Sequence, residues 1–167
     1  MSKLQSEFEQ FVLGKHPNFK FRPQQKEAVL AIIEAYDSDP NGIFLLDCPT
    51  GGGKSIIAML FADFISFKGN RGYILASDLA LHEQYVKDFR NMQLWNWGNI
   101  KGVDNYTCAV NGERFSVGEC KSKGVSYEAA EALPCFKQCG YLTSRKKAIK
   151  SPIALLTYPY ALIQRNY

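Results

Sequence analysis

The chain has 167 residues, of which 46% are hydrophobic and 22% are charged, and its formal net charge is +4. This length suits one domain with a real core, or one domain carrying a large insertion, and it argues against two full domains. The composition excludes wholesale disorder, and the modest positive charge is compatible with an anionic partner.

The N-terminal segment lacks the features of a targeting or membrane sequence. Residues 1–21 have no apolar core behind a basic start, and no later run approaches the ~20 apolar residues of a membrane span. We therefore expect an intracellular protein, in the cytoplasm, nucleoid or nucleus, with no membrane partner. In a reducing compartment the five cysteines are expected to be ligands, catalytic groups or core residues rather than disulfides.

Apolar segments of helical and strand-like pattern alternate over the first part of the chain. The pattern predicts, in order, a helix over 24–35, a strand over 43–47, a helix over 56–67, a strand over 73–76 and a helix over 79–91. Turn formers separate these segments at 37–42 and at 69–72. Alternation of this kind predicts an α/β fold, with a parallel sheet and helices packed on its faces.

The alternation breaks between residue 92 and residue 140. This stretch is rich in glycine and contains cysteines at positions 108, 120, 135 and 139. A structureless excursion of that length is improbable inside a compact domain, so we expect something other than a hydrophobic core to hold it. Order then returns, with a basic helix predicted over 141–150, a strand over 153–157 and the start of a further helix over 158–165.

A glycine-rich loop lies between the first predicted strand and its helix. Residues 48–55 run Cys-Pro-Thr-Gly-Gly-Gly-Lys-Ser, in the context that a phosphate loop needs. Glycines let backbone N–H groups turn toward phosphate oxygens, and the helix N-terminus adds positive charge. Lys54 is expected to contact the β- and γ-phosphates of ATP, and Ser55 to ligate Mg²⁺. Cys48 replaces the usual first glycine, and we interpret it as a small buried residue.

Three segments around this loop resemble the XPD/DinG branch of superfamily 2 DNA helicases. Residues 49–55 resemble motif I, residues 21–25 (Phe-Arg-Pro-Gln-Gln) resemble the R-P-x-Q element, and residues 76–84 are similar to motif Ia. The resemblance implies that Gln25 contacts the adenine edge and that the motif Ia loop, at Ser77, touches the DNA backbone. It implies a nucleotide site formed by Arg22, Gln25, Pro49, Thr50, Gly51, Gly52, Gly53, Lys54 and Ser55.

The late cysteines carry the most specific part of the resemblance. In this family four cysteines inserted between motif Ia and motif II hold a [4Fe–4S] cluster, and a basic helix and an apolar strand follow. Cys108, Cys120, Cys135 and Cys139 stand in the corresponding order. From the residues alone, four thiolates suit either an iron–sulfur cluster or Zn²⁺. Only Cys135 and Cys139 have the spacing of a zinc knuckle. The resemblance, more than this spacing, favours the cluster, and Zn²⁺ or no metal at all are the alternatives.

The same resemblance turns the basic helix into a candidate nucleic-acid interface. It implies that Arg145, Lys146 and Lys147, together with Lys150, line a path for single-stranded or fork DNA, where charge neutralises phosphates and aromatic rings stack on bases. Candidate stacking residues, each of which also suits a core, are Trp95, Trp97, Tyr106, Phe115, Phe136 and Tyr141. His16 and His82 have no ligand spacing and are expected to be structural or solvated.

The resemblance implies a RecA-like P-loop NTPase fold, incomplete and interrupted by an irregular or helical four-cysteine metal-binding insertion. Its parts are the N-terminal portion of motor domain 1 over 1–92, the insertion over 93–140, and the returning helix and strand of motor domain 1 over 141–167. The implied activity is ATP-dependent DNA unwinding, 5′ to 3′ in the complete protein, with a role in DNA repair.

Two parts of such a motor are not found in the sequence. These are the D-E-x-H carboxylates and a second motor domain with its arginine, so we expect the remaining helicase domains in cis, or a helicase partner in trans, and inefficient ATP hydrolysis by this chain alone. One alternative is a nucleic-acid-binding or helicase-regulating module with a vestigial phosphate loop. Another is a zinc-stabilised P-loop nucleotide-binding protein.

Overall fold

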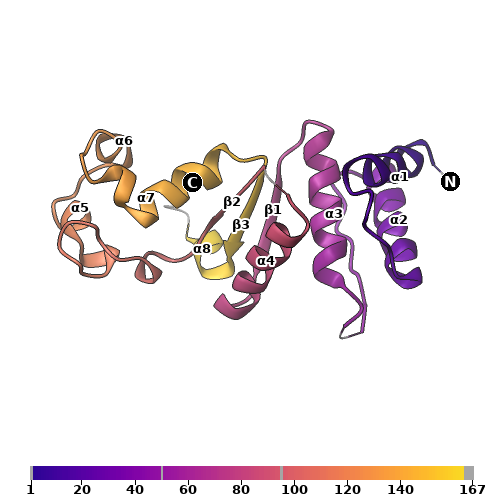
Figure 1. Ribbon diagram of the computed structural model, residues 1–167, viewed down its shortest axis with the longest axis horizontal. Helices are drawn as coiled ribbons and strands as arrows, with labels where there is room; N and C mark the ends of the chain where they lie inside the picture. Colours follow the sequence, from indigo (N-terminus) through magenta and orange to yellow (C-terminus); the bar gives the residue numbers. More distant parts are fainter. Residues whose placement is uncertain (1, 50, 95, 164–167) are drawn as a thin grey trace. The chain divides into compact units, whose positions relative to one another are not determined.

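The computed structural model describes residues 2–49, 51–94 and 96–163, and the chain divides into two compact units at Arg71 and Gly72 (Figure 1). The first unit contains three helices, α1 (Lys3–Lys15), α2 (Pro23–Ser38) and α3 (Lys54–Phe67). Two of these confirm the helices predicted over 24–35 and 56–67, while α1 was not predicted. Within the described residues, no helix is both long and apolar enough to cross a membrane.

Aromatic side chains hold the three helices of the first unit together. Phe64 of α3 makes an edge-to-face contact with Phe8 at 5.3 Å and a tilted contact with Phe11 at 5.5 Å, both on α1. A charged side chain, Asp63, is also buried in this unit and is only 2% exposed. Its carboxylate accepts from Lys15 Nζ at 2.6 Å and lies 3.1 Å from His16 Nε2. Buried carboxylates need such partners, so Asp63 ties the end of α1 to α3.

The strand predicted over 43–47 is absent, and this prediction was wrong. These residues have no regular secondary structure in the structure, and Ile43 and Leu45 are 91% and 96% exposed. A strand forms only when a neighbour satisfies its backbone N–H and C=O groups, and no strand in the described part of the chain pairs with this run. Cys48, expected to be buried at the end of that strand, is accordingly only half-buried.

The second unit is built on a three-stranded parallel sheet (Figure 1). Its order is β1 (Gly72–Ala76), β3 (Ile153–Thr157), β2 (Trp97–Ile100), with Tyr73 opposite Ala154 and Gly98 opposite the same residue on the other side. The central strand β3 is buried along its whole length. This arrangement confirms the α/β class, the parallel sheet and the strands predicted over 73–76 and 153–157.

Helices cover both faces of this sheet. Adjacent residues of a strand point to opposite faces, and on β2 the Trp97 ring stacks on Phe89 of α4 (Leu79–Asn91) at 4.8 Å. Gly98 faces α7 (Gly140–Lys150) so closely that a Cβ there would lie 2.6 Å from the backbone of Ala148. The sheet therefore lies between α4 and α7, and α8 (Tyr158–Leu162) follows directly from β3.

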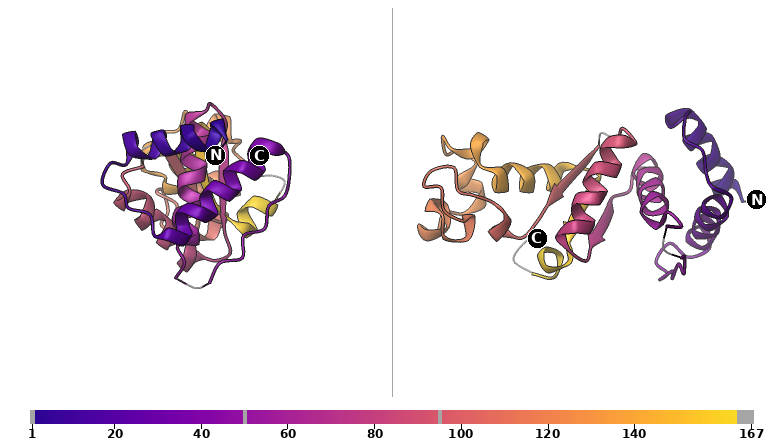
Figure 2. Two further views of the ribbon diagram at one scale, coloured as in Figure 1. Left: turned by 90° about the vertical axis from the view of Figure 1, so that its right-hand side faces the viewer. Right: turned by 60° about the horizontal axis from the view of Figure 1, so that its bottom comes forward.

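Between β2 and α7 the chain folds into short helical turns, drawn in orange in Figure 2. These are η1 (Val103–Asn105), η2 (Phe115–Val117), α5 (Glu119–Ser122), α6 (Tyr127–Ala130) and η3 (Phe136–Gln138). The fully buried Tyr141 of α7 packs against Phe115 at 4.4 Å and Tyr106 at 5.4 Å, and its hydroxyl lies 3.1 Å from that of Tyr127. The segment thus has a hydrophobic core of its own, which the sequence analysis did not predict.

His82 of α4 is fully buried. Burial, followed by the nearby Lys101 ammonium, lowers the pKa of His82. The unfolded chain therefore binds this proton more readily than the folded chain, and stability is full above about pH 6.5 and falls as the pH drops toward the folded pKa.

We expect His82→Leu to remove this acid sensitivity from the second unit. Urea unfolding followed by tryptophan fluorescence at pH 7.5 and 5.5 measures it, because the chain's other histidine, His16, belongs to the first unit. The unaltered chain is expected to lose up to about 1.4 kcal/mol per pH unit across the titration, and the variant much less. Equal losses in the two proteins would contradict the assignment.

Candidate functional site

The glycine loop turns directly into the N-terminus of α3. Gly51 and Gly53 have φ values of 80° and 83°, the left-handed region that favours glycine, and the helix begins at Lys54. The first turn of a helix leaves backbone N–H groups without intrahelical partners, and these groups suit an anion. Thr50, predicted to belong to this loop, lies outside the described residues. The local geometry is thus that of a phosphate-binding turn.

The Lys54 ammonium is folded back onto this loop. Its Nζ donates to the carbonyl oxygen of Cys48 at 2.6 Å and to that of Pro49 at 3.2 Å. Ser55 follows in the first turn of α3 and is half-buried. Lys54 is exposed, so these carbonyl contacts are open to exchange with another acceptor.

Arg22 and Gln25 of the R-P-x-Q element reach the same loop from the N-terminal end of α2. Arg22 Nη1 donates to the carbonyl oxygen of Gly51 at 2.9 Å. The Gln25 side chain accepts from the Arg22 backbone N–H at 3.0 Å and lies against Gly53, where a Cβ would stand only 1.8 Å from Gln25 Nε2. Gly53 therefore requires glycine both for its φ and for the space that Gln25 occupies. The structure brings together the described members of the predicted nucleotide site, all within the first unit.

Ser77 lies in the turn between β1 and α4, as its motif Ia position predicts. It is exposed, and its hydroxyl donates to the Asp78 carboxylate at 2.9 Å. Asp78 caps α4 by accepting from the Leu81 N–H at 2.8 Å, and these two contacts, led by that of Leu81, lower the pKa of Asp78. A carboxylate beside Ser77 opposes a phosphate, so Ser77 alone is a weak anion contact.

The four predicted cysteine ligands lie near one another in the second unit. Burial raises the pKa of Cys120, and Cys135 raises it further through its charge and a hydrogen bond, as do Cys108 and Cys139 through their charges. Burial also raises the pKa of Cys139. At Cys108 burial acts the same way, but backbone N–H groups, chiefly that of Asn111, outweigh it and lower the pKa. Even so, across the described residues, no three His, Cys, Asp or Glu side chains are arranged to hold a metal ion.

The basic side chains of α7 have different surroundings. The Arg145 guanidinium lies over the Tyr127 ring at 3.8 Å, and its Nε is buried with no hydrogen-bond partner among the described residues. Lys146 Nζ pairs with Glu131 at 2.5 Å, and Lys147 Nζ lies 5.4 Å from the centre of the Trp97 ring. Arg145 is thus packed into the protein, whereas Lys147 and Lys150 are exposed.

Several of the predicted stacking residues are core residues. Tyr141 and Phe115 are buried in the aromatic cluster, and Trp97 is buried against Phe89. Phe136 is only half-buried and lies beside the basic helix, while Trp95 falls outside the described residues. Sequence reasoning missed Tyr127 and Glu131, the partners of Arg145 and Lys146. Their four-residue helix α6 and its neighbouring turn are too short for any periodic signal.

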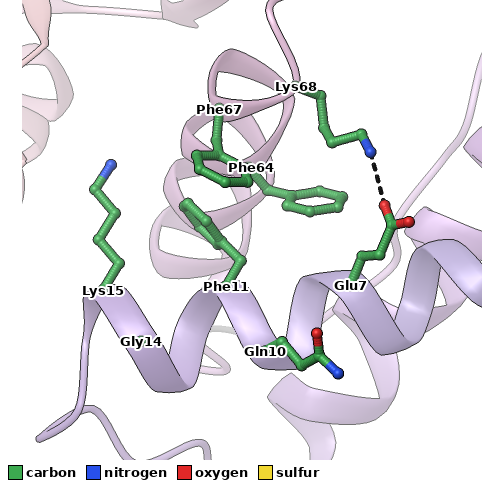
Figure 3. Close-up of a pocket in the computed structure, with 8 residues that line it drawn as sticks. All are labelled: Glu7, Gln10, Phe11, Gly14, Lys15, Phe64, Phe67 and Lys68. Atoms are coloured by element: carbon green, nitrogen blue, oxygen red, sulfur yellow. Dashed lines mark hydrogen bonds and ion pairs between the residues drawn. The ribbon is translucent and has the colours of Figure 1, made fainter.

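A separate hollow of about 740 Å³ lies between α1 and α3 (Figure 3). Its floor is aromatic, with Phe11, Phe64 and Phe67, and an ion pair between Lys68 and Glu7 at 2.7 Å closes one rim. None of the predicted site residues lines it.

The parallel α/β sheet and the glycine loop are each consistent with a P-loop, helicase-like protein. Residues 18–122 match the sequence model of a family described as type III restriction enzyme, res subunit, and this match includes the R-P-x-Q element, the glycine loop and the motif Ia segment. Because it spans more than half of the chain, the chain belongs to this family, as an N-terminal domain of the superfamily 2 helicase type. Comparison with curated protein sequences gives no match.

At the level of the family, this membership indicates helicase-type, ATP-dependent action on nucleic acid, with ATP and Mg²⁺ as the corresponding ligands. The match ends at residue 122, so it includes Cys108 and Cys120 and stops before Cys135 and Cys139.

Proposed function

We propose that this chain is the N-terminal part of an ATP-dependent DNA helicase motor of the XPD/DinG branch. In this proposal the glycine loop binds Mg-ATP, the Ser77 turn and α7 contact single-stranded DNA, and the complete protein unwinds DNA 5′ to 3′. The observation that carries it is the loop itself, where two left-handed glycines lead into a helix N-terminus and both residues of the R-P-x-Q element contact them.

The loop chemistry explains how nucleotide binding would proceed. A phosphate oxygen is a stronger acceptor for an ammonium than a carbonyl is, because it is charged. ATP would therefore draw Lys54 Nζ away from the carbonyls of Cys48 and Pro49. Arg22 and Gln25 would keep the loop backbone in place during this exchange, because they contact Gly51 and Gly53. Bound Mg²⁺ would supply charge neutralisation at the phosphates, beside Ser55.

Titration of the whole chain with a fluorescent ATP analogue, in the presence of Mg²⁺, tests this proposal. Lys54→Ala is expected to weaken binding about tenfold or more, the effect of losing a charge-assisted hydrogen bond of ~1.5–3 kcal/mol. Lys68→Ala, just beyond the other end of α3, is the matched control and should leave the affinity unchanged. Equal affinity of the Lys54 variant and the control would refute the assignment of this loop.

We also propose that Cys108, Cys120, Cys135 and Cys139 hold a [4Fe–4S] cluster in the metal-loaded protein. The support is the donor set, since soft thiolates suit iron–sulfur clusters. The cysteines also lie close enough to act on one another, since after burial the charges of neighbouring cysteines raise the pKa of Cys120 and of Cys139. A bound cluster would stabilise all four as thiolates and fix the short turns that carry them.

Metal analysis of anaerobically purified protein tests the cluster. We expect about four iron and four acid-labile sulfide per chain, lost in Cys108→Ser and Cys135→Ser. Cys48→Ser is the matched control, because Cys48 lies in the phosphate loop, and it should keep the iron. Stoichiometric zinc without sulfide would overturn the cluster and favour the zinc-stabilised alternative, and retention of iron in both variants would remove these cysteines from the site.

A further inference from the structure

A groove of about 420 Å³ runs along the C-terminal half of α7. This volume lies within the range of ~300–1,000 Å³ that small-molecule sites occupy. Its lining combines one aromatic ring with hydroxyl, amide and ammonium groups, and it includes Asn96, Phe136, Thr143, Lys147, Lys150 and Ser151. No carboxylate lines it within the described residues. The charged groups of the groove are therefore all positive, its other polar groups are uncharged, and Phe136 supplies an aromatic ring.

Lys146 stands between this groove and a smaller hollow of about 70 Å³ that contains Glu131. Its Nζ lies 5.1 Å from the centre of the Phe136 ring and pairs with the Glu131 carboxylate at 2.5 Å. Both partners of this ion pair are partly exposed, so it is worth at most ~1 kcal/mol and opens readily. The ammonium therefore covers the Phe136 ring, and Glu131 holds it there.

The remaining lysines of the groove are arranged differently. Lys147 lies over the Trp97 ring, and Lys150 has no ion-pair partner in the part of the chain that the structure describes. Both stand in the last turn of α7, where cations also offset the negative end of the helix dipole. Stabilising the end of the helix does not require a groove. The groove, however, places a half-buried aromatic ring beside three ammonium groups, and these supply the stacking and the charge that single-strand binding uses.

We propose that this groove binds one nucleotide unit of single-stranded DNA, with a base against Phe136 and backbone phosphate at Lys146, Lys147 and Lys150, and that Glu131 competes with the phosphate for Lys146. Binding exchanges the Glu131 carboxylate for a phosphate and moves the Lys146 ammonium off the ring. Glu131 does not line the groove, yet it lowers the affinity of the groove for single-stranded DNA through its ion pair with Lys146. This inference rests on the proposed DNA-binding function and adds the residue that opposes it.

The first experiment compares two neutralised carboxylates by fluorescence anisotropy with a 16-residue deoxythymidine oligonucleotide. Glu131→Gln is expected to tighten binding about threefold, corresponding to ~0.6 kcal/mol of released competition. Glu7→Gln removes the same charge from a comparable ion pair, with Lys68 (Figure 3), and should change affinity less than that. In a Lys146→Gln background, the effect of Glu131→Gln should disappear. Equal effects of the two carboxylate variants would overturn the competition.

The second experiment separates base stacking from charge. Phe136→Leu is expected to weaken binding of the oligonucleotide about fivefold or more, while binding of an abasic strand of equal length stays unchanged. An equal loss for both strands would overturn the stacking role of Phe136. If the unaltered chain binds neither strand, the proposed DNA-binding function itself fails, whereas binding that all these variants leave unchanged refutes the groove alone.

Discussion

Replacing Gly98 by alanine is expected to destabilise the second unit by about 3 kcal/mol. The added Cβ would lie 2.6 Å from both the Cα and the backbone nitrogen of Ala148, and 2.7 Å from the carbonyl carbon of Lys147. Backbone atoms cannot turn aside as a side chain does, so α7 would have to move away from β2. That shift would also disturb the packing around Tyr141, which lies on the same helix.

Urea unfolding followed by tryptophan fluorescence measures this loss, since Trp97 is the residue next to the substitution and is buried on the other face of the sheet. Gly102→Ala is the matched control, because the nearest atom to its Cβ would be Asn105 Nδ2 at 3.5 Å, an ordinary contact. We expect the control to stay within about 0.5 kcal/mol of the unaltered chain. Similar stabilities for the two variants would mean that α7 does not approach β2 as closely as described.

Asp63→Asn is expected to destabilise the first unit by about 2–3 kcal/mol. The substitution keeps the size of the side chain but removes the charge that Lys15 and His16 share. It also replaces one of the two acceptor oxygens by an amide N–H₂ group, so Lys15 and His16 can no longer both donate to this side chain. Lys15 is partly exposed, and its ammonium can be solvated by water once the charge of Asp63 is removed. The loss in free energy of unfolding is therefore expected to be small for a broken buried ion pair.

The measurement is urea unfolding followed by far-ultraviolet circular dichroism, to which α1, α2 and α3 contribute together with the helices of the second unit. Glu9→Gln provides the control, since Glu9 pairs with Lys26 at 2.7 Å in a partly exposed position and its loss should cost less than about 1 kcal/mol. A smaller effect for Asp63→Asn than for Glu9→Gln would show that the buried carboxylate contributes no net stability.

The sequence predicted those elements whose pattern is local and repeated. The helix over 79–91 and the strand over 153–157 appear with the predicted bounds, because an amphipathic face and a continuous apolar run are each visible in one stretch of chain. The run over 43–47 is as apolar as a strand. Whether it forms one depends on a neighbouring strand to pair with, and the five residues alone do not show whether that neighbour is present. β2 was not predicted, because its four residues are too few to show a strand pattern, and it is pairing with β3 that makes them a strand.

The candidate site shows the same division between local pattern and tertiary contact. The glycine loop, Arg22 and Gln25 were predicted from motif residues, and the structure brings them together. The surroundings of the α7 cations were not predictable, because Arg145 and Lys146 find their partners in Tyr127 and Glu131, which come from a segment without periodicity. A run of basic residues reveals charge, and only the fold reveals which of those charges remain available.

The central strand of the sheet is also the last of the three to be made. β1 and β2 contact each other only through β3, so after residue 100 both must wait for residues 153–157 before either has a strand neighbour. At synthesis rates of ~5–20 residues per second, this interval lasts several seconds on the ribosome. During that time Ile74, Trp97 and Ile100 have no sheet to cover them. We therefore expect the nascent chain to expose these apolar side chains, a condition that favours aggregation, until β3 emerges.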